Sequence, residues 1–248
     1  DDIGGQVLPQ GEDEPRMDNM RRPRNGTFYH YGLATLAESA AAIEPSKGGN
    51  SMCEIFGNYG WAEGVRLEKY LADHFLVRGI NWFVPHAFSG KAFPDPDCPP
   101  HFYAHGHNPQ YRHFGRLMAY MNRVATLTSA GAHEAPVAVL YHGEAEWCDP
   151  GAMPFEQVVR PLYDDQIACR VLPADVFSEP GRYQTELGNP LIVNGQPYRA
   201  FVVPGAARMP AAAANALAEL SQKGLPVVFA GSRPAALKRG DIRIDVAF

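Results

Sequence analysis

Hydrophobic and polar positions follow two different periods along the first half of the chain. Apolar residues recur at steps of three and four, the spacing of an amphipathic helix, over residues 28–45, 62–79 and 110–131. Two shorter apolar runs, 51–57 and 80–88, match buried strands. The alternation of strand and helix predicts parallel strands that are joined by crossover helices.

The lengths of the connections add a second indication. Long stretches rich in Pro, Gly and charged residues follow the strands, at 6–27 and 89–109, whereas the turns that follow helices are short. In a (β/α) barrel the loops on the strand-to-helix side carry the active site. We therefore predict an α/β fold in which residues 1–133 form part of a (β/α)8 barrel.

The alternation starts again near Ala135, after a polar stretch at 131–134. The expected strands are 135–142, 168–177, 199–205 and 225–231, and the expected helices are 155–166 and 211–224. We predict that residues 134–248 form a separate, open parallel α/β domain of flavodoxin-like type.

Composition and charge exclude several classes of protein. With 46% hydrophobic and 20% charged residues the chain can build a core. The net charge is -5, and the 22 Lys and Arg residues are scattered, so neither nucleic acid nor a membrane surface is an expected partner. Four cysteines without a CxxC motif indicate reduced thiols in a cytoplasmic protein. No cofactor is predicted.

Glu54 is the first candidate for chemistry, because it stands inside the apolar run Met52 to Phe56. A buried carboxylate is costly unless another group pairs with it or a reaction uses it. Tyr59 and Trp61 follow in a glycine-broken turn, and aromatic rings beside carboxylates suit sugars. Glycosidases need two carboxyl groups that flank the scissile bond. An ion pair of Glu54 with Arg or Lys, or a capping role for the next helix, is an equally weighted alternative.

Histidines and further carboxylates are secondary candidates. His101, His105 and His107 are close enough in sequence for zinc, but they occupy a Pro-rich loop without a carboxylate in register. Sugar contacts, assigned to His105 and His107, or a plain surface loop are favoured over a metal, and no metal site is predicted. For Glu144, after the first strand of the second domain, a solvated loop is the favoured interpretation, and a substrate contact is kept as a secondary one.

Two loop motifs are given structural explanations. The prolines around Asp95 and Asp97 account for a rigid loop without Ca²⁺. The segment 204–213 lacks the GxGxxG and GK[ST] patterns, so it is read as an ordinary strand-to-helix turn and not as a phosphate site.

Several motifs in order resemble glycoside hydrolase family 106, the α-L-rhamnosidases and their relatives. They are "MCEIFGNYGW", "LVRGINWFVPHAFS", "NPQYRHFGRLMAYMNRV", "PVAVLYHGEAEW" and "QIACRVLPADVF". The resemblance covers most of residues 28–177. Cys53 stands where this group has Ser, and His142 where it has Pro.

The resemblance implies that the chain is the C-terminal half of a large glycoside hydrolase. Glu54 would be the carboxylate of barrel strand seven, a nucleophile or base. His86 would contact the sugar from strand eight, and Asp1 and Asp2 would mark the end of strand six, with Asp2 near the substrate. The general acid would lie on a strand upstream of Asp1. The chain alone would then be weak or inactive, and it could form a homo-oligomer.

Two other functions remain open at this point. One is a non-catalytic module for carbohydrate binding or oligomerisation. The other, given less weight, is a metal-dependent hydrolase that uses the histidine loop. The favoured function is that of a glycosidase acting on an oligosaccharide or glycoside of a plant or host glycan.

Overall fold

The computed structural model describes residues 27–57, 59–97, 99–231 and 245–247. The chain divides into two compact units. Unit 1 comprises the residues up to Ala37 together with Asn50–His133, and unit 2 comprises Glu38–Gly49 and the residues from Glu134 onward. The sequence-based limits, 1–133 and 134–248, differ from this division in residues 38–49, and they stay a prediction for the domains of the protein.

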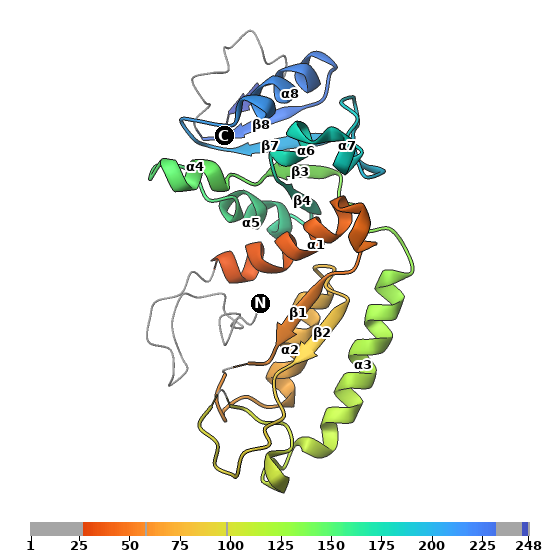
Figure 1. Cartoon of the computed structure of the whole chain (residues 1–248), viewed down its shortest axis with the longest axis vertical. Helices are drawn as coiled ribbons and strands as arrows, with labels where there is room; N and C mark the ends of the chain where they lie inside the picture. Colours follow the sequence, from red (N-terminus) through yellow and green to blue (C-terminus); the bar gives the residue numbers. More distant parts are fainter. Residues whose placement is uncertain (1–26, 58, 98, 232–244, 248) are drawn as a thin grey trace. The chain divides into compact units, whose positions relative to one another are not determined.

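Unit 1 contains two parallel strands and the helices that cover one face of them (Figure 1). Strand β1 pairs with β2 in parallel, with Glu54 opposite Val84. The elements in chain order are a π-helix Phe28–Gly32, the start of α1 (Leu33–Ile43), β1 (Met52–Ile55), α2 (Val65–Leu76), β2 (Trp82–Pro85), a 3-10 turn Ala104–Gly106 and α3 (Tyr111–Ser129).

The two faces of this small sheet differ in burial. Cys53 and Ile55 are in the core of unit 1, which also takes in Leu71, Phe75 and Met121 from α2 and α3. Alternation along a strand sends the neighbouring side chains to the opposite face. Met52 is 51% exposed, Trp82 62% and Val84 53%, so that face is open in the described structure.

Unit 2 is built on a five-stranded parallel sheet in the order β4-β3-β7-β8-β9. Its strands are β3 (Val137–Leu140), β4 (Cys169–Leu172), β7 (Ala200–Pro204), β8 (Val227–Ala230) and β9 (Asp245–Ala247). Numbered by sequence within the sheet, this is the order 2-1-3-4-5 of flavodoxin-like folds. The predicted fold class, α/β with parallel strands in both parts, is confirmed.

Helices and one hairpin fill the connections of unit 2. They are a 3-10 turn Pro45–Lys47, α4 (Gly143–Cys148), α5 (Glu156–Asp164), α6 (Asp175–Ser178), α7 (Pro180–Tyr183), β5 (Leu191–Val193), β6 (Gln196–Tyr198) and α8 (Ala211–Gln222). Strands β5 and β6 are antiparallel and turn at Asn194 and Gly195, whose φ angles are 46° and 73°. Asn-Gly favours such left-handed turn geometry.

The second half of α1 belongs to unit 2, although it precedes most of unit 1 in sequence. Its buried Glu38 forms hydrogen bonds with the guanidinium of Arg170 on β4, at 2.9 Å to Nε and 2.8 Å to Nη2. Ser39 Oγ accepts a hydrogen bond from the Val171 amide at 2.9 Å. This polar contact crosses 132 residues of sequence.

Candidate functional site

Glu54 lies at the carboxyl end of β1, on the open face of the two-stranded sheet. Its register places it beside Val84, and it shares that face with Met52 and Trp82. The side chain is half-buried. Within the described ranges the Glu54 carboxylate makes no hydrogen bond or ion pair, and the N-cap residue of α2 is Gly64, so Glu54 does not cap that helix. The part of the chain that the structure describes therefore provides no partner that would explain Glu54 as a structural ion pair or a helix cap.

His86 directly follows β2 and lies at the same carboxyl edge as Glu54. Its backbone N–H donates to the carbonyl of Ile55 at 2.8 Å, which continues the parallel pairing by one residue. The buried Nδ1 has no hydrogen-bond partner among the described residues. A buried nitrogen without a partner costs free energy in the unliganded protein, and a bound hydroxyl group would satisfy it.

Trp61 and the histidine loop form an aromatic cluster. The Trp61 ring meets Phe93 and His101 edge to face, with ring centroids 5.7 and 5.8 Å apart, and it keeps 43% of its surface exposed. His107 stacks on Phe93 at 4.2 Å. The ring contacts of Trp61 are thus with the loop after β2. His107 contributes to a ring surface that is suited to packing on sugar C–H groups.

His105 and His101 are held by backbone carbonyls. His105 Nε2 lies 2.7 Å from the Lys91 carbonyl, and His101 Nε2 lies 2.8 Å from the Asp97 carbonyl. Among the residues that the structure describes, no group of three or more His, Cys, Asp or Glu side chains could hold a metal ion. Asp95 accepts hydrogen bonds from Ser89 and from the Asp97 amide, so it has a role within its loop.

Tyr59 is corrected from a substrate contact to a core residue. It has no exposed surface and belongs to the hydrophobic core of unit 1. Sequence alone could not separate Tyr59 from Trp61, because both are aromatic residues beside Gly60 in the same turn.

Two further predicted site residues are Asp2 and Glu144, and their roles stay predictions, as do those of the others. Asp2, with Asp1, lies outside the described residues. Glu144 is exposed on α4 in unit 2. It was expected in a loop, and the short helix α4 replaces that loop.

A pocket that the sequence did not predict lies between the starts of α2 and α3. Gln110, just before α3, accepts a hydrogen bond from the Val65 amide at 2.8 Å and so caps α2 from outside. A Cβ on Gly64 would lie 2.7 Å from the Gln110 side chain, so glycine permits this close packing. The lining residues are Glu63, Gly64, Val65, Glu68, Phe102, Asn108, Gln110, Tyr111 and Phe114.

Glu68 is the unusual member of this pocket. It is 5% exposed, and its Oε2 has no hydrogen-bond partner in the described part of the chain. Burial raises the pKa of Glu68 from 4.5 to about 7. A sequence signal existed, because Glu68 occupies a position on the apolar stripe of α2 between Val65 and Leu71. The pocket itself joins segments more than forty residues apart, which no local pattern reveals.

The pKa of Glu68 predicts a pH-dependent stability. A carboxyl group whose pKa is higher in the folded than in the unfolded state stabilises the fold below pH 4.5, and that contribution is lost as the pH rises through about 7. For the full chain, the Glu68 contribution should fall by up to about 3 kcal/mol over this range. Urea unfolding in chelator between pH 5 and 8 measures it, with Glu68→Gln as the comparison. If the free energy of unfolding changed with pH in the same way in both proteins, the prediction would be contradicted.

None of the helices in the described ranges is long and apolar enough to cross a membrane.

Comparisons with known proteins identify the fold. No family model matches the sequence, and no curated protein matches it. The structure is similar to a rhamnosidase from Novosphingobium sp. PP1Y, with a TM-score of 0.55 and 20% identity over 83% of this chain. It is also similar to Gan42B, a GH42 β-galactosidase (TM-score 0.58, 14% identity, 88% of this chain), and to a β-galactosidase from Rahnella sp. R3 (0.54, 15%, 88%).

The chain spans 20%, 31% and 32% of the lengths of these three proteins. At these identities the likeness concerns the fold. The chain has a glycoside hydrolase-like α/β fold.

Proposed function

We propose that this chain is part of a longer glycoside hydrolase, of the α-L-rhamnosidase type of family 106, and that Glu54 is one of its two catalytic carboxyl groups. The observation that carries the proposal is the place of Glu54. It stands at the carboxyl end of a parallel strand, half-buried, with no ion-pair or hydrogen-bond partner in the described ranges. In (β/α) barrels, catalytic groups come from the carboxyl ends of strands.

The chemistry follows from the requirements of glycoside hydrolysis. One carboxyl group protonates the leaving oxygen, and the other acts as nucleophile or activates water on the opposite side of the sugar. Glu54, as a carboxylate, suits the second role. His86 at the same edge would hydrogen-bond to a sugar hydroxyl, and its Nδ1 without a partner supports that role.

The aromatic cluster supports a saccharide as the substrate. Trp61 offers an exposed ring on the loop after β1, and His107 with Phe93 offers a second stacked surface on the loop after β2. Both loops follow the carboxyl ends of their strands, which is the side that binds substrate in barrel enzymes. Similarity in fold to a rhamnosidase and to β-galactosidases agrees with this class of substrate.

The test is an assay of aryl-glycosides, rhamnosides first and galactosides second. It compares a longer polypeptide that contains this sequence with the 248-residue chain. We expect turnover by the longer polypeptide and weak or no turnover by the shorter one, because the partner carboxyl group is proposed to precede Asp1. Absence of glycosidase activity in the longer polypeptide would refute the proposal. Equal activity of the longer polypeptide and the 248-residue chain would mean that the second catalytic carboxyl group lies within the 248 residues.

A non-catalytic module is the second candidate, and one observation favours it. The open face of β1 and β2 exposes Met52, Trp82 and Val84, which is typical of a surface that another segment or chain covers. Sugar binding without turnover by the longer polypeptide would support this candidate.

A further inference from the structure

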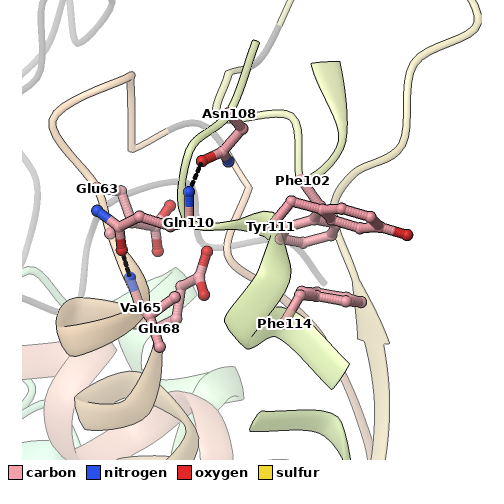
Figure 2. Close-up of a pocket in the computed structure, with 9 residues that line it drawn as sticks. Glu63, Val65, Glu68, Phe102, Asn108, Gln110, Tyr111 and Phe114 are labelled. Carbon is pink, nitrogen blue, oxygen red and sulfur yellow. Dashed lines mark hydrogen bonds between the residues drawn. The ribbon is translucent and has the colours of Figure 1, made fainter. Parts of the chain in front are cut away.

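Aromatic rings gather around the loop that follows β2 in unit 1. The buried ring of Phe102 lies 5.3 Å from that of Phe88 and 4.3 Å from that of Phe114, between centroids. Tyr111 lies 6.3 Å from Phe88, and Tyr103 lies 5.1 Å from Tyr111. Figure 2 shows the rings of Phe102, Tyr111 and Phe114 together, with the Tyr111 hydroxyl pointing away from the other labelled polar side chains.

Three of these rings are accessible, and we call them the aromatic patch. Phe88 is 59%, Tyr103 48% and Tyr111 40% exposed. The hydroxyl groups of Tyr103 and Tyr111 make no hydrogen bond within the described ranges. A group of exposed rings is typical of a binding surface, and tyrosine adds a polar end to an apolar face. The patch can therefore pack on C–H groups and also hydrogen-bond to hydroxyl groups, and a sugar presents both.

The patch rests on a fixed base. Phe102 is 1% exposed, and its backbone N–H donates to the carbonyl of Ala87 at 3.0 Å, which ties its segment to the residue before Phe88. Tyr111 is the first residue of α3, and its ring stacks on that of Phe114 in the next turn at 6.2 Å. Rings that are held in place before binding lose little freedom when a ligand packs on them.

The patch also continues the proposed substrate site. Phe88 follows His86 by two residues, a length of chain that spans at most about 7 Å. The spacings of 6.3 Å from Phe88 to Tyr111 and 5.1 Å from Tyr111 to Tyr103 are similar to the length of one sugar unit. A glycan with one unit at His86 would therefore place its next units over the patch.

We propose that the aromatic patch binds sugar units beyond the unit at His86, and that the substrate is an oligosaccharide of three or more units. The assignment rests on the proposed function, because that function places a sugar at His86. A second copy of this chain is the other occupant that an exposed aromatic surface could take, and the test below separates it from a glycan.

The experiment is a calorimetric titration of the full 248-residue chain. The probes are linear rhamno-oligosaccharides and galacto-oligosaccharides of one to four sugar units. We expect the Kd to fall by about 10-fold or more between one and three units in at least one series, because the longer probes reach the patch. Equal affinity for all lengths in both series, or no binding of any probe, would overturn the proposal.

Two variants assign the effect to the patch. Tyr103→Ala and Tyr111→Ala should each weaken binding of the three-unit probe by about 10-fold and leave binding of the single unit unchanged. The matched control is Trp147→Ala, which removes an aromatic ring that is 82% exposed in unit 2 and should bind every probe as the unmodified chain does. If circular dichroism shows that one variant is unfolded, the other carries the test.

Further outcomes separate the patch from the proposed function. Patch variants that keep the affinity for long probes but change the sedimentation coefficient of the chain would identify a surface between copies and overturn the proposal. Cleavage of aryl-glycosides by the longer polypeptide, without any effect of probe length on binding, would refute the patch alone. Length-dependent binding that Tyr111→Ala weakens, without cleavage of any glycoside by the longer polypeptide, would support the patch and refute the proposed function.

Discussion

A Glu54→Gln substitution in the proposed longer glycosidase is expected to lower kcat for an aryl-rhamnoside by about 100- to 10,000-fold. Glutamine has nearly the shape of glutamate but can neither attack the anomeric carbon nor accept a proton from water. Because Glu54 has no hydrogen-bond or ion-pair partner among the described residues, the substitution breaks no such contact, and the Tm should change little. Steady-state kinetics together with a thermal scan measure both quantities.

The controls separate chemistry from folding. Glu186→Gln changes an exposed carboxylate in unit 2 and should keep full activity. In a Glu54→Ala variant the removed side chain leaves room for external azide, a small nucleophile, so azide rescue of that variant in a retaining enzyme would assign the nucleophile role to Glu54. Full activity of Glu54→Gln would mean that Glu54 is structural and that the site assignment fails.

Removal of Glu38 is expected to destabilise unit 2 by about 3–5 kcal/mol. The Glu38→Ala change leaves the Arg170 guanidinium buried without its carboxylate, while the Gln196 side chain, at 3.0 Å, stays as a neutral partner. The side chains of Arg170 and Glu38 are 4% and 9% exposed, so water cannot replace the lost contact without opening the core. Urea unfolding followed by far-UV circular dichroism measures the loss.

Two comparisons test this explanation. Arg182→Ala removes the partner of Glu44 in a pair in which Arg182 is 52% exposed, and it should cost no more than about 1 kcal/mol. The double change Glu38→Leu with Arg170→Met replaces the ion pair by apolar groups and should recover most of the stability. A cost below about 1 kcal/mol for Glu38→Ala would contradict the assigned role of the buried pair.

Sequence periodicity predicted the main strands and helices because those segments are long and strongly patterned. The strand at Val137–Leu140 and the helix at Tyr111–Ser129 are examples. The helix α4 was missed because its six residues are too few to display a period. The β5–β6 hairpin has a sequence signal in Asn194-Gly195, which favours a hairpin turn, but it was not among the predicted elements.

The candidate site was less predictable than the fold. The position of Glu54 at a strand end follows from local sequence, because a strand and a glycine turn are local features. The burial of Tyr59 and the pocket around Glu68 depend on tertiary contacts with residues of α3 and the preceding loop. A single sequence does not contain the information on which distant segments meet.

The pairing of α1 with β4 has a consequence for biosynthesis. Residues 38–49 leave the ribosome before unit 1 is complete, yet their partner Arg170 is made 132 residues later. Unit 2 therefore cannot close until nearly the whole chain has been translated, while unit 1 has all of its described elements by His133. The chain grows from the N-terminus at about 5–20 residues per second. Arg170 is therefore synthesised on the order of ten seconds after Glu38. A nascent chain stalled before β4 would contain all the described elements of unit 1 but only part of unit 2.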